Sequence, residues 1–432
     1  MAATKNTKAF YNTEIPSDWS ALEFGDIFSF IKSFSFSREQ LTSEPTNDEI
    51  RNIHYGDIHA TYVNEILDLD IEKTIPYLLD GIIDPKSFDD ESFPSLKEGD
   101  LIIADASEDY EGVCDCVELK NIKGAKIVSG LHTFAARAKD EKIAIGYRTY
   151  ALQHEQVIRE LRRIATGTSV YGVSKTNLSK VKIPLPPLLE QKAIAQVLST
   201  ADAAIHTTEK LIAQKELRKK WLMQQLLTGK KRLMGFEETK WKIQPLENFF
   251  KPIVREVPKP STPYLGIGLR SHGKGTFLKH NEQPEKNSMD NFYVVRPNDL
   301  IINITFAWEQ AIAIVRPEDD GALASHRFPT YTFIEDRGHP DFFRFYILKP
   351  RMKSMLQIIS PGGAGRNRVM NKSDFIKLEF LLPDYKEQTA IAQVLQAVDR
   401  EISLLKAKAE KLREQKKGLM QVLLTGKKRL ML

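Results

Sequence analysis

The stretch EQKAIAQVL, residues 190–198, decides the organisation of the chain, because it returns as EQTAIAQVL at residues 387–395. The offset is 387 − 190 = 197 residues. LLTGKKRL, residues 226–233, recurs unchanged at residues 423–430, again 197 residues later. No insertion separates the two copies, so the chain contains an internal repeat that governs any assignment of its fold.

Between these flanks the heptad positions of both copies, most of them apolar, recur at alternating steps of four and three. In the second copy they are Ile391, Leu395, Val398, Ile402, Leu405, Ala409, Leu412, Lys416, Leu419 and Leu423. In the first copy they are Ile194, Leu198, Ala201, Ile205, Thr208, Ile212, Lys215, Lys219, Leu222 and Leu226. This spacing predicts a coiled-coil seam, which Thr208, Lys215 and Lys219 weaken in the first copy. A long helix that is polar elsewhere needs a partner stripe, so we expect the two helices to pair as an antiparallel coiled coil.

Prolines and glycines mark where each helix begins and ends. Pro187 and Pro383 cannot lie inside a helix, while Gly229 and Gly426 supply the left-handed residue that ends one. About 38 residues lie between these limits, so each helix spans roughly 57 Å at ~1.5 Å per residue. Helices of this length are suited to act as rulers.

The segments before the helices echo one another. GDLII at 99–103 answers NDLII at 298–302, and GLHTF at 130–134 answers ASHRF at 324–328. Buried-strand patterns at 100–104, 293–295 and 300–302, with helical patterns at 153–164 and 340–359, predict α+β halves that share one strand-rich fold. The expected division is an N-terminal extension (1–18), a first domain (19–183), a central helix region (184–235), a second domain (236–383) and a C-terminal helix region (384–432).

Composition bounds the protein class. A chain of 432 residues exceeds a single core, so at least two domains are expected. Its 42% hydrophobic and 28% charged residues are typical of a soluble protein, and no apolar run approaches the ~20 residues of a membrane span. The first residues lack the apolar core of a secretory signal, so we expect a cytoplasmic protein. Cys114 and Cys116 give no disulfide framework, and with His132 they give no set of metal ligands.

The formal net charge of +5 is unevenly distributed. Residues 209–232 contain eight basic and two acidic residues, and residues 400–429 contain ten basic and three acidic residues. These segments carry +6 and +7, which leaves −8 for the remainder. Such clusters are an electrostatic footprint that polyanion binding can use, and the alternative interpretation is a solvated face on each long helix.

Catalytic motifs are missing from the sequence. An adenine methyltransferase needs an Asn/Asp-Pro-Pro-aromatic loop, whereas PLPP at 184–187 lacks both the amide and the aromatic residue. GLRSHGKG at 268–275 has the spacing of a phosphate loop, but Gly275 stands where Ser or Thr must bind magnesium. His132 and His326 occupy matching places in the two halves, where a structural histidine is favoured over a site residue. We expect no catalytic residue, cofactor or metal in this chain.

The repeat and its flanks resemble the specificity subunits of Type I restriction-modification systems over essentially the whole chain. KIPLPP at 182–187 leading into Glu190-Gln191, its second copy, the LLTGKKR endings and GDLIIADAS at 99–107 carry the resemblance, although LLPD at 381–384 departs by losing prolines. The resemblance implies two target-recognition domains that each read one half of a bipartite double-stranded DNA target, with the helices fixing the gap. It also implies two docked methyltransferase subunits, later joined by restriction-translocase subunits, to which catalysis, S-adenosylmethionine and ATP belong.

Loops rich in Arg, Lys, Asn and Gly supply the candidates for DNA contact, because glycine lets the backbone approach phosphate while Arg and Asn can read guanine and adenine edges. In the second half they are Arg270, Lys274, Arg366, Asn367 and Arg368. In the first half the weaker candidates are Thr168, Ser169, Tyr171, Lys175 and Asn177. A solvated surface loop is the alternative for each. The rival functions are an autonomous enzyme with an unrecognised site and a purely structural coiled-coil scaffold.

Overall fold

The computed structural model describes residues 6–62, 65–89, 91–362 and 368–430. Arg366 and Asn367 lie outside these described residues. The chain divides into unit 1, residues 1–209 with 407–432, and unit 2, residues 210–406. No described helix is both long and apolar enough to cross a membrane.

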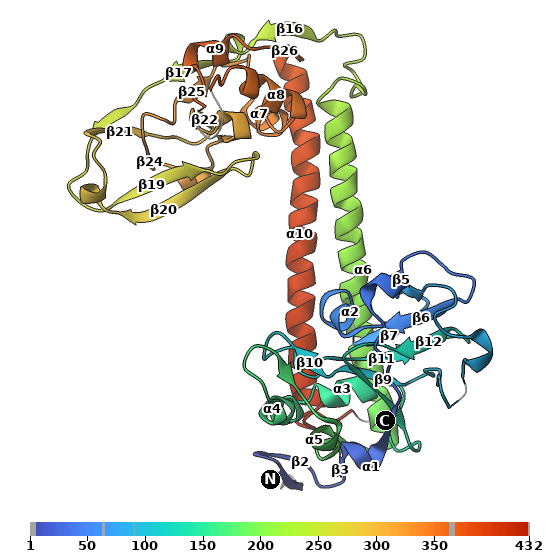
Figure 1. The fold of residues 1–432 in the computed structure, drawn as a ribbon. Coiled ribbons are helices and arrows are strands. Elements are labelled where there is room, and N and C mark those ends of the chain that lie inside the picture. Colours follow the sequence, from blue (N-terminus) through green and yellow to red (C-terminus); the bar gives the residue numbers. More distant parts are fainter. Residues whose placement is uncertain (1–5, 63–64, 90, 363–367, 431–432) are drawn as a thin grey trace. The chain divides into compact units, whose positions relative to one another are not determined.

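Two helices of 39 residues each, α6 (Leu188–Leu226) and α10 (Tyr385–Leu423), carry the repeat (Figure 1). α6 begins directly after Pro187, and α10 begins two residues after Pro383. Gly229 and Gly426, which follow the helix ends, have φ angles of 71° and 67°. These are the left-handed conformations that terminate helices, so the predicted helix limits are confirmed.

The helices pair antiparallel, as predicted. None of the predicted seam positions is exposed. In unit 1, Ile194 near the start of α6 shares a core with Leu423 at the end of α10. In unit 2, Leu226 at the end of α6 shares a core with Ile391 near the start of α10.

The lysines of the first seam meet carboxylates of the partner helix instead of interrupting the pairing. In unit 2, the ammonium of Lys219 lies 2.6 Å from a carboxylate oxygen of Asp399, and Lys215 is equally close to Glu401. The Lys219 ammonium also lies 5.6 Å from the ring centroid of Phe345, so a cation–π contact accompanies the ion pair. The polar seam positions therefore favour this register.

The same pairing recurs in unit 1, where Lys416 lies 2.5 Å from Asp202. Lys416 follows Lys219 by 197 residues, and Asp202 precedes Asp399 by 197 residues. Unit 1 adds a second carboxylate, because Glu65 lies 2.6 Å from the Lys416 ammonium. The C-terminal helix is thus bound both to α6 and to the first globular domain.

The repeated Glu-Gln and Lys-Lys-Arg motifs contact each other within each unit. In unit 1, the Arg429 guanidinium donates two hydrogen bonds of 2.6 Å to Glu190. In unit 2, Arg232 donates two bonds of 2.6 Å to Glu387. A tryptophan indole N–H donates to the same carboxylate in each unit. Both motifs recur because they are the two halves of one contact, which joins the end of one helix to the start of the other.

Unit 1 is built on a five-stranded sheet in which the central strand pairs antiparallel with both neighbours. Its order is β4 (Phe28–Ile31), β13 (Thr133–Ala138), β9 (Leu101–Ala104), β11 (Cys116–Lys120) and β7 (Ile66–Asp68). A second sheet has the order β12 (Lys126–Ser129), β6 (Ile50–Ile53), β8 (Tyr77–Leu78) and β5 (Leu41–Thr42). Two-stranded pairs are β1 (Thr7–Phe10) with β2 (Thr13–Pro16), β3 (Ser20–Glu23) with β15 (Lys182–Leu185), and β10 (Ala106–Ser107) with β14 (Tyr171–Gly172). The short helices are α1 (Phe24–Ile27), α2 (Tyr55–Ala60), α3 (Arg148–Leu152), α4 (Glu155–Ile164) and α5 (Lys175–Ser179), with 3-10 helices η1 (Arg38–Gln40) and η2 (Pro85–Ser87).

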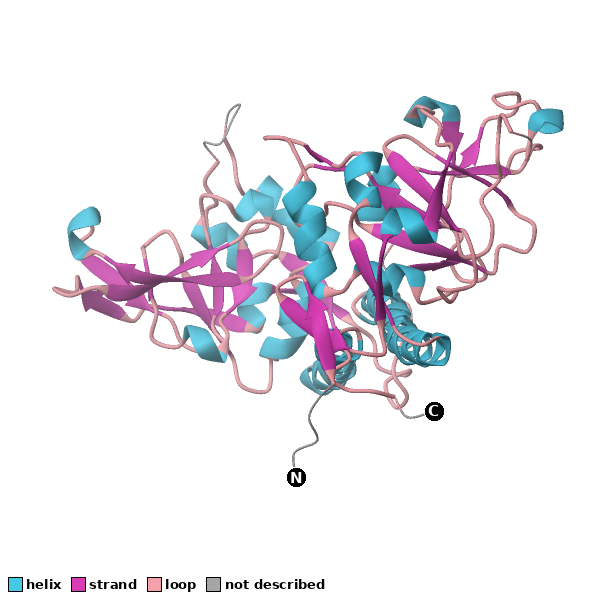
Figure 2. Cartoon of the chain, turned by 90° about the horizontal axis from the view of Figure 1, so that it is seen from below, coloured by secondary structure: helices cyan, strands magenta, loops and turns pink. Residues whose placement is uncertain are grey.

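Unit 2 repeats the first four strands of that order as β17 (Phe250–Ile253), β25 (Thr330–Phe333), β22 (Leu300–Ile302) and β23 (Ile312–Ile314). Its second sheet is β18 (Glu256–Pro258), β21 (Asn291–Val294), β24 (Leu323–Ala324), β19 (Tyr264–Leu269) and β20 (Thr276–Glu282), and β16 (Lys242–Pro245) pairs with β26 (Glu379–Leu382). The short helices are α7 (Pro340–Tyr346), α8 (Pro350–Ile358) and α9 (Lys372–Ile376), with 3-10 helices η3 (Leu246–Asn248), η4 (Pro284–Lys286), η5 (Ala307–Glu309) and η6 (Pro317–Asp319). Figure 2 shows strands throughout both globular parts, which confirms the α+β class.

The single helix predicted for residues 340–359 is wrong. The chain forms α7 and α8 instead, because Pro350 lacks the N–H that a continuous helix needs. Lys349 before it is extended, with φ −65° and ψ 144°, as steric conflict with the proline ring requires. The helix predicted for residues 153–164 begins at Glu155, where the side chain of His154 caps it.

Candidate nucleic-acid interface

Three loops of unit 1 meet beyond the end of the central strand β9. The Asp105 N–H donates to the His132 carbonyl oxygen at 3.1 Å, and the Val173 N–H donates to the Asp105 carbonyl oxygen at 2.9 Å. The carboxylate of Asp105 also lies 3.2 Å from Nδ1 of His132. We call residues 105–115, 129–133 and 165–177 the unit 1 platform.

Unit 2 joins three loops by the same two backbone bonds. The Ile304 N–H donates to the Arg327 carbonyl oxygen at 3.0 Å, and the Met370 N–H donates to the Ile304 carbonyl oxygen at 2.8 Å. Within the described residues, 303–311, 324–328 and 368–374 form the unit 2 platform. The last loop of each platform precedes matching helices, because Lys175 of α5 and Lys372 of α9 are 197 residues apart.

The first-half candidates all lie in the third loop of the unit 1 platform or on α5. Thr168 and Ser169 are exposed in the loop, and Asn177 is exposed on α5. The Asn177 backbone N–H donates to the Ser174 hydroxyl at 3.2 Å, which caps this short helix. The side chain of Asn177 is thereby presented to solvent from a fixed backbone.

Aromatic rings support the two remaining first-half candidates. The ring of Tyr171 meets that of Tyr110, in the first loop, edge to face with centroids 5.3 Å apart. The Lys175 ammonium lies 5.4 Å from the Phe30 ring centroid and 5.5 Å from that of Phe134. Both candidates are therefore positioned by packing before any ligand arrives.

The second-half candidates come from two places in unit 2. Two backbone bonds of 2.7 and 2.9 Å run from residues 272–273 to residues 309–310 and hold the β19–β20 turn against η5. Arg270 and Lys274 are exposed in this turn, although Arg270 also donates to the Thr276 carbonyl oxygen at 2.8 Å. The fold thus brings this turn to the first loop of the unit 2 platform, a contact that sequence reasoning did not reveal.

Arg368 lies in the third loop of the unit 2 platform and is half-buried. Its guanidinium carbon is 5.3 Å from the ring centroid of Trp308 on η5. Trp308 was not among the candidates, and neither was Tyr110. A signal for both existed, because each follows the matching strand of its half by a similar distance, at an offset of 198 residues.

The unit 1 platform is acidic, because its sequence holds Asp105, Glu108, Asp109, Glu111 and Asp115 against one lysine, Lys175. Two of its carboxylates contact histidines. Burial raises the pKa of the Asp105 carboxyl, although neighbouring His132 and Lys175 act to lower it. His59 of α2 bridges the first loop, with Nε2 3.2 Å from the Ala106 carbonyl oxygen and Nδ1 3.2 Å from the Asp115 carboxylate. The hydrogen bond from Asp115 raises the pKa of His59. Both neighbours are acceptors, so both ring nitrogens donate when the imidazole is protonated.

The two cysteines flank Asp115 in the sequence, and both are buried. Cys114 and Cys116 are buried thiols at the edge of the unit 1 core. Burial raises the pKa of Cys114 to about 12, so it stays protonated at neutral pH. Among the described residues, no group of three or more His, Cys, Asp or Glu side chains is arranged to hold a metal ion.

Comparison with known proteins identifies one family that shares this sequence and fold. A family model described as the Type I restriction modification DNA specificity domain matches residues 16–216 and 254–414, one stretch beginning in each half. The specificity subunit of the type I restriction enzyme MjaX from Methanocaldococcus jannaschii is 28% identical to this chain, over 96% of this chain and 94% of that protein. The MjaVIII specificity subunit of the same organism is 23% identical, over 98% of this chain and 96% of that protein.

Solved structures agree on the fold. The crystal structure of a Type I restriction-modification S subunit from M. genitalium matches with a TM-score of 0.53 and 14% identity, over 97% of this chain and 98% of that one. A structure from work on the structural basis of complex assembly and conformational transition of the type I R-M system also matches with a TM-score of 0.53. Its sequence identity is 15%, over 96% of this chain and 99% of that one. With two matches that together span most of its length, the chain belongs to the Type I restriction-modification DNA specificity family.

Proposed function

We propose that each platform of this specificity subunit contacts one half of a bipartite DNA target. The observation that carries the proposal is that both platforms use the same backbone bonds but present different side chains. Tyr171 in unit 1 and Arg368 in unit 2 stand 197 residues apart at matching positions, braced by Tyr110 and Trp308. A shared scaffold with divergent side chains suits two domains that read different sequences.

The chemistry of the exposed residues divides their expected roles. Lys175 and Lys274 are suited to phosphate, as flexible point charges, whereas Asn177 and Arg368 have the donors that read base edges. The remaining proposed contacts are Arg270, Thr168, Ser169 and Tyr171, together with Arg366 and Asn367 outside the described residues.

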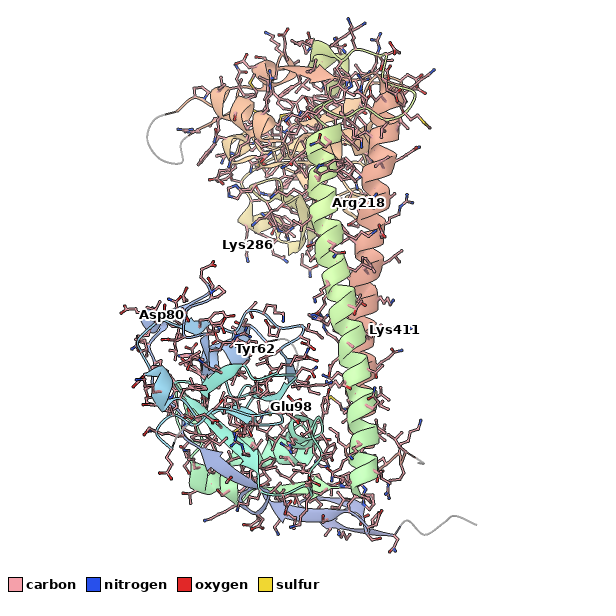
Figure 3. The ribbon with its side chains drawn as sticks, turned by 90° about the vertical axis from the view of Figure 1, so that its right-hand side faces the viewer. Tyr62, Asp80, Glu98, Arg218, Lys286 and Lys411 are labelled. Carbon is pink, nitrogen blue, oxygen red and sulfur yellow. The ribbon has the colours of Figure 1, made fainter. Side chains whose placement is uncertain are left out.

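We assign to α6 and α10 the spacing of the two half-sites and the docking of two methyltransferase subunits, with restriction-translocase subunits joining afterwards. Many basic residues of the helices are taken up by ion pairs, so the +6 and +7 segments are in part an internal pairing surface. Others face solvent, among them Arg218 on α6 and Lys411 on α10, labelled in Figure 3. Catalysis and its cofactors belong to the partner subunits in this proposal, and residues 19–183 and 236–383 are its two recognition domains.

The test is an exchange of residues 19–180 for the first domain of another family member, followed by selection of target sequences from random DNA. One half of the target should change while the other half and the gap stay the same. Exchanging residues 236–383 is the matched control and should alter the opposite half. A properly folded chimaera that changes both halves contradicts modular reading, and failure to bind DNA with methyltransferase subunits present favours the scaffold alternative.

A further inference from the structure

One matching position of the two platforms, occupied by Tyr171 and Arg368, differs in chemistry between them. The backbone around it is fixed in the same way in both units, through the N–H groups of Val173 and Met370. Each side chain lies against an aromatic residue of the first loop. The ring centroids of Tyr171 and Tyr110 are 5.3 Å apart, and the guanidinium carbon of Arg368 is 5.3 Å from the ring centroid of Trp308. This position therefore varies in donors and charge while its support stays constant.

The support of Arg368 is itself rigid. Trp308 is half-buried, and its indole N–H donates to the Thr305 carbonyl oxygen at 3.2 Å, which fixes the plane of the ring. A guanidinium held over such a ring has fewer accessible orientations, so less side-chain entropy is lost when it binds. A contact to phosphate does not need an oriented side chain, because an exposed lysine such as Lys274 or Lys372 can bind phosphate as a point charge.

We propose that Arg368 reads a guanine in the half-site bound by unit 2, with Trp308 as its positioning residue. The planar fork of Arg368 matches the O6 and N7 acceptors that guanine presents in the major groove. Tyr171 offers one hydroxyl in place of the fork, so the matching position of unit 1 has a different base preference. This inference rests on the proposed function, since it requires that the unit 2 platform faces DNA.

The experiment uses the full chain with its methyltransferase subunits and selection from DNA with both half-sites randomised. The half read by unit 2 is the one that survives exchange of residues 19–180. That half should contain an invariant G·C pair. In Arg368→Lys, which keeps the charge but loses the fork, discrimination at that pair should fall by at least about fivefold, with other positions unchanged.

Substitutions of Trp308 separate positioning from simple loss of structure. Trp308→Leu removes the stacking surface and should reduce discrimination at the same base pair, while affinity for unrelated DNA stays constant. Trp308→Phe keeps a ring and should restore most of the discrimination. Thermal unfolding of each variant verifies that unit 2 remains folded.

Arg296→Lys is the matched control, because Arg296 is an exposed arginine of unit 2 paired with Asp320 at 3.1 Å, and it should leave selection unchanged. The inference is overturned if the unit 2 half-site has no invariant G·C pair, or if discrimination at that pair in Arg368→Lys is as strong as in the wild type. For Arg368→Lys the deciding result is this discrimination, because a variant with weakened discrimination can still enrich the wild-type sequence. The inference is also overturned if Arg368→Ala weakens all sequences alike, as loss of a phosphate contact would. If the wild-type chain selects no bipartite sequence, the proposed function itself fails.

Discussion

Replacing Lys416 with methionine tests how the C-terminal helix is held in unit 1. Its ammonium lies 2.5 Å from Asp202 and 2.6 Å from Glu65, and only 11% of the Lys416 side chain is exposed. The hydroxyl of Tyr150 donates to Asp202 at 2.5 Å. Methionine fills a similar volume, so the change removes the charge while largely preserving the packing.

The structure sets the size of the effect. Lys416→Met leaves two carboxylates in a mostly buried site without their cation, which should lower the free energy of unfolding by about 3 kcal/mol. Lys219→Met is the matched control from the other copy of the repeat. Its partner Asp399 is 41% exposed, and among the described residues Lys219 has no second carboxylate partner. We therefore expect a change of less than about 1 kcal/mol.

Acidity gives an independent check on the cause. Burial and the charge of Glu65 raise the pKa of Asp202, while Lys416 acts to lower it. A carboxyl whose pKa is raised by folding disfavours the folded state once ionised, and removing Lys416 strengthens this effect. The deficit of Lys416→Met should therefore be largest at neutral pH and shrink as the pH falls through the pKa of Asp202.

Hydrogen exchange during a urea titration is the appropriate assay, because it reports unit 1 and unit 2 separately when the chain does not unfold in one step. Lys416→Met should lower protection in the second half of α10 and in the first domain. Equal losses in the Lys416 and Lys219 variants, or a deficit that grows in acid, would refute the reasoning.

Three further outcomes are expected. Inserting one heptad after Glu209 and one after Lys411 keeps the Glu209–Arg413 and Lys416–Asp202 pairs and lengthens each helix by about 10 Å. The preferred gap between the half-sites should widen by up to about three base pairs. An unchanged gap in an intact complex would show that the helices do not set the spacing. Below about pH 6.5, protonated His59 should protect residues 105–115 from hydrogen exchange better than glutamine does in His59→Gln. This extra protection should be lost as the pH rises through the raised pKa of His59. A difference in protection between the two proteins that does not depend on pH would argue against the bridge. The purified chain alone should show no methyl transfer, nuclease or ATPase activity, and turnover by a verified pure sample would refute this.

The long helices could be predicted because their determinants are local and repeated. A heptad pattern, a proline before the start and a glycine after the end need no knowledge of distant residues. The same pattern could not show that Lys219 and Lys416 meet Asp399 and Asp202, because apolar periodicity says nothing about which charges face each other across a pair. The break at Pro350 was visible in the sequence, and the helical periodicity on both sides concealed it.

The candidate site was predictable only segment by segment. Glycine, arginine and lysine content drew attention to residues 168–177 and 366–368, each a continuous stretch of sequence. Trp308, Tyr110 and His59 join those loops from far along the chain, through contacts that depend on the arrangement of strands. The sequence points to Tyr110 and Trp308 only through their matching places 198 residues apart, and it does not show which loops they join.

Selection of bound sequences from fully random DNA tests the central claim most directly. The full chain, assembled with its methyltransferase subunits, should enrich one target made of two specified half-sites separated by a gap of fixed length and unspecified sequence. An uninterrupted target, two half-sites at variable spacing, or no enrichment by an intact complex would contradict the account.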